Sequence, residues 1–159
     1  MNETACCFTG HRTIPPESWE PLHGRLMQTI DNLYASGIRT FYAGGALGFD
    51  TISAEAVVSY RLLHPEVSLV LAIPCRNQTH RWKQEAVVRY EKMLAEANQT
   101  IYVSEQYDRE CMQRRNEFMV DHSSVCVCYL TKARGGTANT VVYAVMQGLK
   151  IVNIANVKF

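Results

Sequence analysis

Short, almost wholly apolar segments alternate with helix-like segments along the whole chain, and this alternation restricts the fold more than any other feature. Segments 67–73 and 125–130 are apolar on both faces, which is typical of strands in a parallel sheet that helices cover on both sides. Segment 17–36 instead places leucine and isoleucine at helical spacing. The sequence therefore predicts an α/β fold, a Rossmann-like, doubly wound, mostly parallel sheet with helices on both faces.

The predicted elements follow one another without a linker or an internal repeat. Strands are predicted at 5–8, 40–43, 67–73, 99–103, 125–130 and 151–154, and helices at 17–36, 51–63, 81–97, 108–122 and 139–148. A length of 159 residues suits one compact unit. We therefore predict a single domain over residues 1–159.

Composition excludes several classes of protein. Hydrophobic residues make up 47% and charged residues 19%, which is typical of a globular rather than a disordered chain. No segment approaches the ~20 apolar residues of a membrane span, so we expect a cytoplasmic protein without a membrane partner. The net charge of +1 gives no overall attraction for a polyanion, which weighs against nucleic acid as a partner.

The six cysteines do not have the spacing of a metal site. No Cys-x-x-Cys pair occurs and the histidines lack zinc-finger spacing, so no metal is predicted. Most of the cysteines fall inside predicted strands and are interpreted as buried, reduced thiols. Cys75 follows a strand and is expected near the mouth of a site, where a catalytic thiolate is the less favoured interpretation.

Two glycine-rich turns, 44–50 and 134–140, each join a predicted strand to a predicted helix. Glycine lets the backbone approach a ligand closely, and the start of a helix offers free N–H groups with partial positive charge. Because both turns follow strands of a parallel sheet, they predict one shared pocket for a phosphate or carboxylate group. Turn 44–50 is neither Gly-x-Gly-x-x-Gly nor a P-loop, so the motif indicates neither ordinary nicotinamide binding nor ATP hydrolysis.

Other side chains near the predicted sheet edge have two interpretations each. Arg12 either clamps a phosphate in bidentate fashion or pairs with a surface carboxylate. His11 is either a ligand contact or a hydrogen-bonded core histidine. Asp50 is either a helix cap or an acceptor for a ribose hydroxyl. Glu55 either lines the pocket or lies on a solvated helix face.

The helix-like segment 108–122 carries a further arginine of interest. Arg115 shares a helix face with Met119, four residues later. If that face points to the core, the guanidinium needs a buried partner. The alternative is an ordinary surface ion pair with Glu117 or Asp121.

Four motifs in this order resemble the YpsA-like branch of the SLOG superfamily, which also contains the DprA/Smf proteins and the LONELY GUY phosphoribohydrolases. They are Thr9-Gly10-His11-Arg12, the Gly-Gly-Ala-x-Gly-Phe-Asp of 44–50, the Arg-Asn-x-x-Met-Val-Asp of 115–121 and the Gly-Gly-Thr-x-Asn-Thr of 135–140. The resemblance spans essentially the whole chain. It implies a Rossmann-like fold and a pocket for a nucleotide or nucleotide-derived ligand.

The motifs and the resemblance together define the predicted ligand-binding residues. These are Gly10, His11, Arg12, Gly44, Gly45, Gly48, Asp50, Arg115, Asn116, Gly135, Gly136, Thr137 and Asn139. The LONELY GUY motif has a glutamate where this chain has Val142, and N-glycosidic cleavage needs a carboxylate to stabilise an oxocarbenium-like transition state. Glu55, Asp50 and Arg115 are therefore the candidates for any catalytic role.

The sequence leaves three functions open and disfavours a fourth, DNA binding in the manner of the DprA proteins, because the net charge is only +1. The first is a binding module for a phosphorylated small molecule, either a nucleotide or an ADP-ribose-like ligand, with no cofactor specified. The second is a phosphoribohydrolase-like enzyme that uses a non-standard carboxylate. The third is a structural or regulatory protein, and a homo-oligomer or a regulatory protein partner is compatible with each.

Overall fold

A single six-stranded parallel sheet forms the centre of the computed structural model, which describes residues 2–155. Its strands lie in the order β4-β3-β2-β1-β5-β6, and every neighbouring pair is parallel. They are β1 (Ala5–Gly10), β2 (Thr40–Ala43), β3 (Ser68–Ile73), β4 (Gln99–Tyr102), β5 (Val125–Tyr129) and β6 (Lys150–Asn153). The predicted Rossmann-like α/β fold is confirmed.

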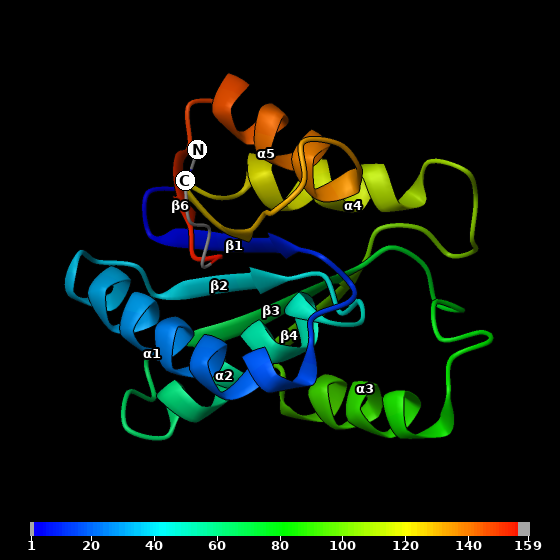
Figure 1. Cartoon of the computed structure of the whole chain (residues 1–159), viewed down its shortest axis with the longest axis horizontal. Coiled ribbons are helices and arrows are strands. Elements are labelled where there is room, and N and C mark those ends of the chain that lie inside the picture. The colour runs from blue at the N-terminus through cyan, green and yellow to red at the C-terminus, as the bar shows by residue number, and fades with distance from the viewer. Residues whose placement is uncertain (1, 156–159) are drawn as a thin grey trace.

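Five α-helices cover the two faces of the sheet. They are α1 (Trp19–Ala35), which follows a short 3-10 turn at Pro16–Ser18, α2 (Phe49–Arg61), α3 (Gln84–Glu96), α4 (Cys111–Asp121) and α5 (Gly136–Met146). Figure 1 shows α1, α2 and α3 on one side of the sheet and α4 and α5 on the other. None of these helices combines the length and the apolarity that a membrane span needs.

Burial on both faces explains why the strands are so uniformly apolar. In β1, Cys6 and Phe8 belong to the core that packs against α1, α2 and α3. Cys7, between them, belongs to the second core cluster, together with Met119 of α4 and Ala144 of α5. Successive side chains of a strand alternate between faces, so a strand buried on both sides has no polar face to show. All six cysteines are buried and unpaired.

Helix starts differ from the sequence prediction by two or three residues, α4 for example beginning at Cys111 rather than at 108, and two of these differences matter for the backbone. Helix α3 was expected from Arg81 but begins at Gln84, because Arg81 has a left-handed φ of 74° that no α-helix contains. Helix α5 was expected from Asn139 but begins at Gly136. The Gly-Gly-Thr segment is therefore the first turn of α5 and not a loop ahead of it.

The strand order places the switch point of the sheet between β1 and β5. From β1 the chain builds outward through β2 and β3 to β4, and it then returns to the other side of β1 to add β5 and β6. Connections on the two sides run over opposite faces, which opens a crevice beyond the carboxyl ends of β1 and β5. The loops that leave β1, β2 and β5 all start at this edge.

Candidate functional site

A cavity of about 390 Å³ lies at this switch point. Its wall combines the end of β1 and the loop after it, the loop from β5 into α5, one face of α4 and two residues near the start of α2. The lining residues are Phe8, Thr9, Gly10, His11, Arg12, Thr13, Ala46, Asp50, Met112, Arg115, Asn116, Met119, Lys132, Arg134, Gly135, Gly136 and Thr137. Both glycine-rich turns thus contribute to one cavity, as the sequence predicts.

The start of α5 opens into this cavity. Gly135 precedes the helix with a φ of 114°, a conformation that strains any residue with a side chain. No side chain caps the helix, and a Cβ atom at Gly135 or Gly136 would have no neighbour within 4 Å. No side chain of these two glycines therefore covers the first N–H groups of α5, an arrangement that favours an anion at this end of the helix.

Four cationic side chains line the cavity: Arg12, Arg115, Lys132 and Arg134. Within residues 2–155, the ion pairs shorter than 4.0 Å lie elsewhere, and none of them involves these four residues. Asp50 is the one carboxylate of the lining set. The cavity is therefore strongly positive although the whole chain carries a net charge of only +1.

Arg115 is the buried cation of the four, with 5% of its surface exposed. Its Nη1 donates to the Gly44 carbonyl, its Nε donates to Asn116 Oδ1 at 2.8 Å, and its Nη2 lies 3.7 Å from Met112 Sδ. A Cβ atom at Gly44 would collide with the guanidinium, so this approach requires glycine. Burial lowers the pKa of Arg115, and the nearby carboxylate of Asp50 opposes that shift.

The predicted need of Arg115 for a buried partner is met by neutral acceptors. The surface pairs with Glu117 or Asp121 do not form. A carbonyl and an amide oxygen satisfy hydrogen bonds without neutralising the charge, so the guanidinium keeps its attraction for an anion.

Asp50 lies in the first turn of α2 and is 6% exposed. Its Oδ2 accepts a hydrogen bond from the Ala46 N–H at 3.1 Å, so the carboxylate holds the turn before the helix rather than capping the helix itself. Burial raises the pKa of Asp50, while Arg115, the Ala46 N–H and Arg12 act in the opposite direction.

His11 joins two of the loops that surround the cavity. Its Nε2 accepts a hydrogen bond from the Thr131 N–H at 3.0 Å, which requires an unprotonated Nε2. Partial burial lowers the pKa of His11, and the charge of Lys132 lowers it further. The neutral imidazole therefore links the loop after β1 to the loop after β5.

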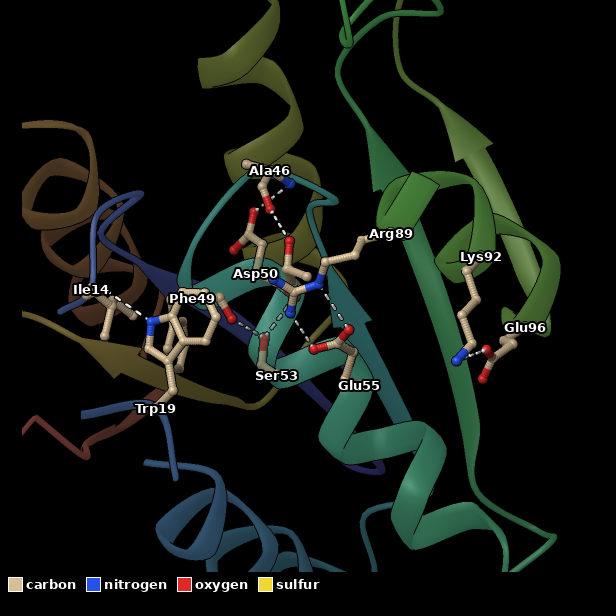
Figure 2. A network of polar contacts seen from close by, with 11 residues as sticks. Ile14, Trp19, Ala46, Phe49, Asp50, Ser53, Glu55, Arg89, Lys92 and Glu96 are labelled. Atoms are coloured by element: carbon tan, nitrogen blue, oxygen red, sulfur yellow. Dashed lines mark hydrogen bonds and ion pairs between the residues drawn. The ribbon is translucent and has the colours of Figure 1, made fainter. Parts of the chain in front are cut away.

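Glu55 does not reach the cavity. It lies on the same helix as Asp50, but Figure 2 shows the two side chains turned to different partners, Asp50 to Ala46 and Glu55 to Arg89. The Glu55–Arg89 ion pair measures 2.6 Å, and the two side chains are 46% and 40% exposed. Asp50 is thus the only predicted carboxylate that the fold places at the site.

The structure also keeps four other predicted residues off the cavity wall. Gly44 and Gly45 lie behind it, where the Gly44 carbonyl accepts from Arg115 and the Gly45 carbonyl accepts from Gln78 Nε2 at 3.2 Å. Gly48 precedes α2 and packs against the backbone of Arg12. Asn139 is exposed on α5.

The sequence prediction missed Lys132 and Arg134 among the lining residues. Both directly precede the Gly135 turn, and two cations beside a glycine-rich helix start are a signal that was available. Cys75, expected near the mouth, is fully buried away from the wall, and burial raises the pKa of its thiol. Among residues 2–155, no three histidine, cysteine or acidic side chains gather closely enough to hold a metal ion.

Val142 occupies the position that the LONELY GUY motif gives to glutamate. Its side chain is 57% exposed on α5 and is not part of the cavity wall. The lack of a carboxylate at this position therefore does not leave the cavity without one, because Asp50 enters from α2.

Several proteins are similar to this chain in sequence. A SPbeta prophage-derived protein of Bacillus subtilis, YoqJ, is 29% identical over 136 residues, which cover 77% of this chain and 80% of YoqJ. The UPF0398 protein SH1465 of Staphylococcus haemolyticus is 24% identical over 115 residues, covering 71% of this chain and 59% of that protein.

Solved structures share the fold at lower sequence identity. DprA from Streptococcus pneumoniae superposes with a TM-score of 0.64 and 15% identity over 94% of this chain, but this corresponds to only 49% of DprA. Helicobacter pylori DprA, whose structure describes a single-stranded DNA binding mode, gives a TM-score of 0.65 at 16% identity, covering 94% of this chain and 64% of DprA. TM1055 gives 0.60 at 14% identity, covering 95% and 72% of the two chains.

The model of the YspA SLOG family covers three of the four motifs, those at 44–50, 115–121 and 135–140, while the motif at 9–12 precedes the matched range. It matches residues 17–155, nearly the whole of the described chain. This protein belongs to the YspA SLOG family.

Proposed function

We propose that this protein is a binding module for a nucleotide or nucleotide-derived ligand whose phosphate lies at the start of α5. The observation that carries the proposal is Arg115, a buried guanidinium that lines the cavity and has no carboxylate within 4.0 Å among the described residues. Asp50 acts on this charge only from beyond 4.0 Å, and a buried cation without a carboxylate in direct contact costs free energy. A bound phosphate removes that cost and accepts the hydrogen bonds that the guanidinium still has to offer.

The rest of the wall supports an anion of phosphate size. The N–H groups of Gly136 and Thr137 are at the open start of α5, and Lys132 and Arg134 line the wall just before it. Arg12 approaches from the loop after β1, with Nη2 4.0 Å from Met112 Sδ and no carboxylate partner among residues 2–155. The cavity volume is within the range of small-molecule sites.

A hydrolase is favoured by one observation, the presence of Asp50 in the wall. N-glycosidic cleavage needs a carboxylate near the sugar, and this cavity has one although position 142 does not supply it. We expect nucleoside monophosphates to survive prolonged incubation with the protein. If the protein releases the free base, and D50N abolishes this release while E55Q leaves it unchanged, the protein is a hydrolase and the binding-module proposal is wrong.

Single-stranded DNA is a further candidate ligand. Arg12, Lys132 and Arg134 are exposed around the cavity, and the local charge is positive, so the small net charge is a weaker argument against nucleic acid than the sequence suggested. DprA of the same fold binds single-stranded DNA. An oligonucleotide that binds here should show affinity that falls steeply with salt, with a slope of about −0.7 per phosphate contact.

Calorimetric titration of the purified chain tests the proposal. Pyrophosphate, AMP, ADP and ADP-ribose are compared with an oligothymidylate. We expect R134Q to weaken binding of every phosphate ligand and K92Q to leave it unchanged, since Lys92 lies on α3 beside Glu96 and outside the cavity. Equal affinities for the wild-type protein and R134Q, or no binding of any phosphate ligand at millimolar concentration, would contradict the proposal.

A further inference from the structure

Asp50 is an unexpected component of a phosphate site. It lines the same cavity as four cations, and its negative charge opposes the binding of any anion there. Only one oxygen of Asp50 stabilises the turn before α2, since Oδ2 accepts a hydrogen bond from the Ala46 N–H. The structural role of Asp50 in this turn therefore explains Oδ2 but not Oδ1.

The other oxygen of Asp50 is open to the cavity. Among the described residues, Oδ1 has no hydrogen-bond partner. It is not sealed in the core either, because the one buried side-chain oxygen or nitrogen without a partner in residues 2–155 is Gln78 Oε1. Since Asp50 lines the cavity and is otherwise 94% covered, as its 6% exposure shows, Oδ1 is its accessible atom.

We infer that Asp50 recognises a free sugar hydroxyl, so that the site selects a monomeric ribose phosphate or ribonucleotide; this inference depends on the proposed phosphate site. A carboxylate oxygen only accepts hydrogen bonds, and Asp50 lines the same cavity as the start of α5, so the sugar hydroxyls of a ligand whose phosphate lies at α5 are the donors that this oxygen needs. A hydroxyl-free analogue leaves Oδ1 unpaired after water is excluded, which costs affinity.

The same chemistry disfavours the interior of a DNA strand. An internal deoxynucleotide has no 2′-hydroxyl, and its 3′-oxygen is esterified, so its sugar offers Asp50 no hydroxyl donor. A DNA strand bound by Arg12, Lys132 and Arg134 therefore leaves Asp50 Oδ1 without a hydrogen bond from a sugar hydroxyl. The two candidate ligands of this cationic site thus differ in whether they use Asp50.

Calorimetry with four phosphate probes tests the inference: pyrophosphate, AMP, 2′,3′-dideoxy-AMP and ribose 5-phosphate. For the wild-type protein we expect AMP to bind at least about tenfold more tightly than its dideoxy analogue, as for a hydrogen bond to a charged group. In D50N we expect this ratio to fall, because the hydrogen bond to the hydroxyl is no longer charge-assisted, while pyrophosphate binds equally or more tightly because a negative charge has gone. Ribose 5-phosphate that matches AMP identifies a sugar phosphate as the ligand, whereas weaker binding identifies a nucleotide.

The matched control is E55Q, which removes a carboxylate from the same helix outside the cavity and should keep the wild-type ratio. Equal wild-type affinity for AMP and its dideoxy analogue overturns the hydroxyl inference but leaves the phosphate site standing, and this comparison needs no variant to fold. An equal loss of all four probes in D50N also overturns it, because Asp50 then only holds the turn. No binding of any probe to the wild-type protein overturns both proposals.

Discussion

Two hollows in the described part of the chain contain the same kinds of charged residue but arrange them differently. The groove between α2 and α3, of about 250 Å³, is lined by two cations and two glutamates. There Arg89 pairs with Glu55 at 2.6 Å and Lys92 with Glu96 at 3.8 Å. The cavity at the switch point contains four cations and one carboxylate, without an ion pair shorter than 4.0 Å among the described residues.

This difference in ion pairing distinguishes charged side chains that stabilise the fold from charged side chains that are free to bind a ligand. Paired, half-exposed side chains such as Glu55 and Arg89 neutralise each other and contribute little to stability. Arg115 is held by a carbonyl and an amide oxygen, which fix its orientation, and its nearest carboxylate, Asp50, lies too far away for an ion pair within 4.0 Å. A buried charge without an ion pair destabilises the folded protein. Such a charge therefore indicates a functional site more strongly than an exposed, paired arginine does.

Replacing the buried cation should produce the largest contrast between the two hollows. We expect R115M to weaken pyrophosphate binding by roughly 10- to 100-fold, the effect of losing charge-assisted hydrogen bonds. R89M, the matched change in the α2–α3 groove, should change the affinity less than about twofold because its partner is Glu55 and not a ligand. Calorimetric titration measures both, and similar losses in the two variants would remove the distinction.

Substitutions at Gly44, behind the cavity wall, and at Gly136, in the wall, should affect different properties: the first the stability of the fold, the second the affinity for phosphate. In G44A the new methyl group meets Arg115 and lies 2.7 Å from Asp50 Oδ2, so we expect a loss of about 1–3 kcal/mol in the free energy of unfolding. In G136A the methyl group enters open space, so stability should hold while phosphate binding weakens. Urea unfolding and calorimetry measure the two effects, and a stable G44A protein would show that the approach of Arg115 to Gly44 is loose.

Breaking the ion pair of the α2–α3 groove should have a small effect. E55Q removes a carboxylate that is 46% exposed, so we expect a stability change of less than about 1 kcal/mol that shrinks further in high salt. Thermal or urea unfolding at two salt concentrations measures it. A change of several kcal/mol would mean that this pair is part of the core and not of the surface.

The smallest expected effect is a pH dependence from His11. The folded state lowers the pKa of His11, so between that lowered value and the ordinary 6.5 the unfolded chain binds more protons. Its contribution to stability is therefore fully present above pH 6.5 and is lost as the pH falls below 6.5 toward the folded pKa, when the Thr131 hydrogen bond breaks. Urea unfolding across this window should show a smaller loss for H11N than for the wild-type protein, and parallel profiles would contradict the assignment.

The sequence predicts the sheet and its edge well because these depend on local patterns. Segment 125–130 consists of valine, cysteine, tyrosine and leucine without a charged residue, and this pattern predicts burial on both faces. The end of β1 at Gly10 and the Gly135 turn line one cavity because parallel strands bring their carboxyl ends together. The predicted start of α3 was wrong because the residue with the left-handed conformation, Arg81, is not a glycine, so the sequence gives no indication of a turn there.

The sequence by itself determined the α/β class, the strand and helix order and the edge of the sheet where polar residues gather. Only the tertiary structure decided which of those residues face the same space. Asp50 and Glu55 are five residues apart on one helix and looked equivalent, yet one lines the cavity and the other pairs with Arg89. The reason is that helix phase and the neighbouring α3 set the direction of each side chain, and packing between distant segments cannot be read from local spacing.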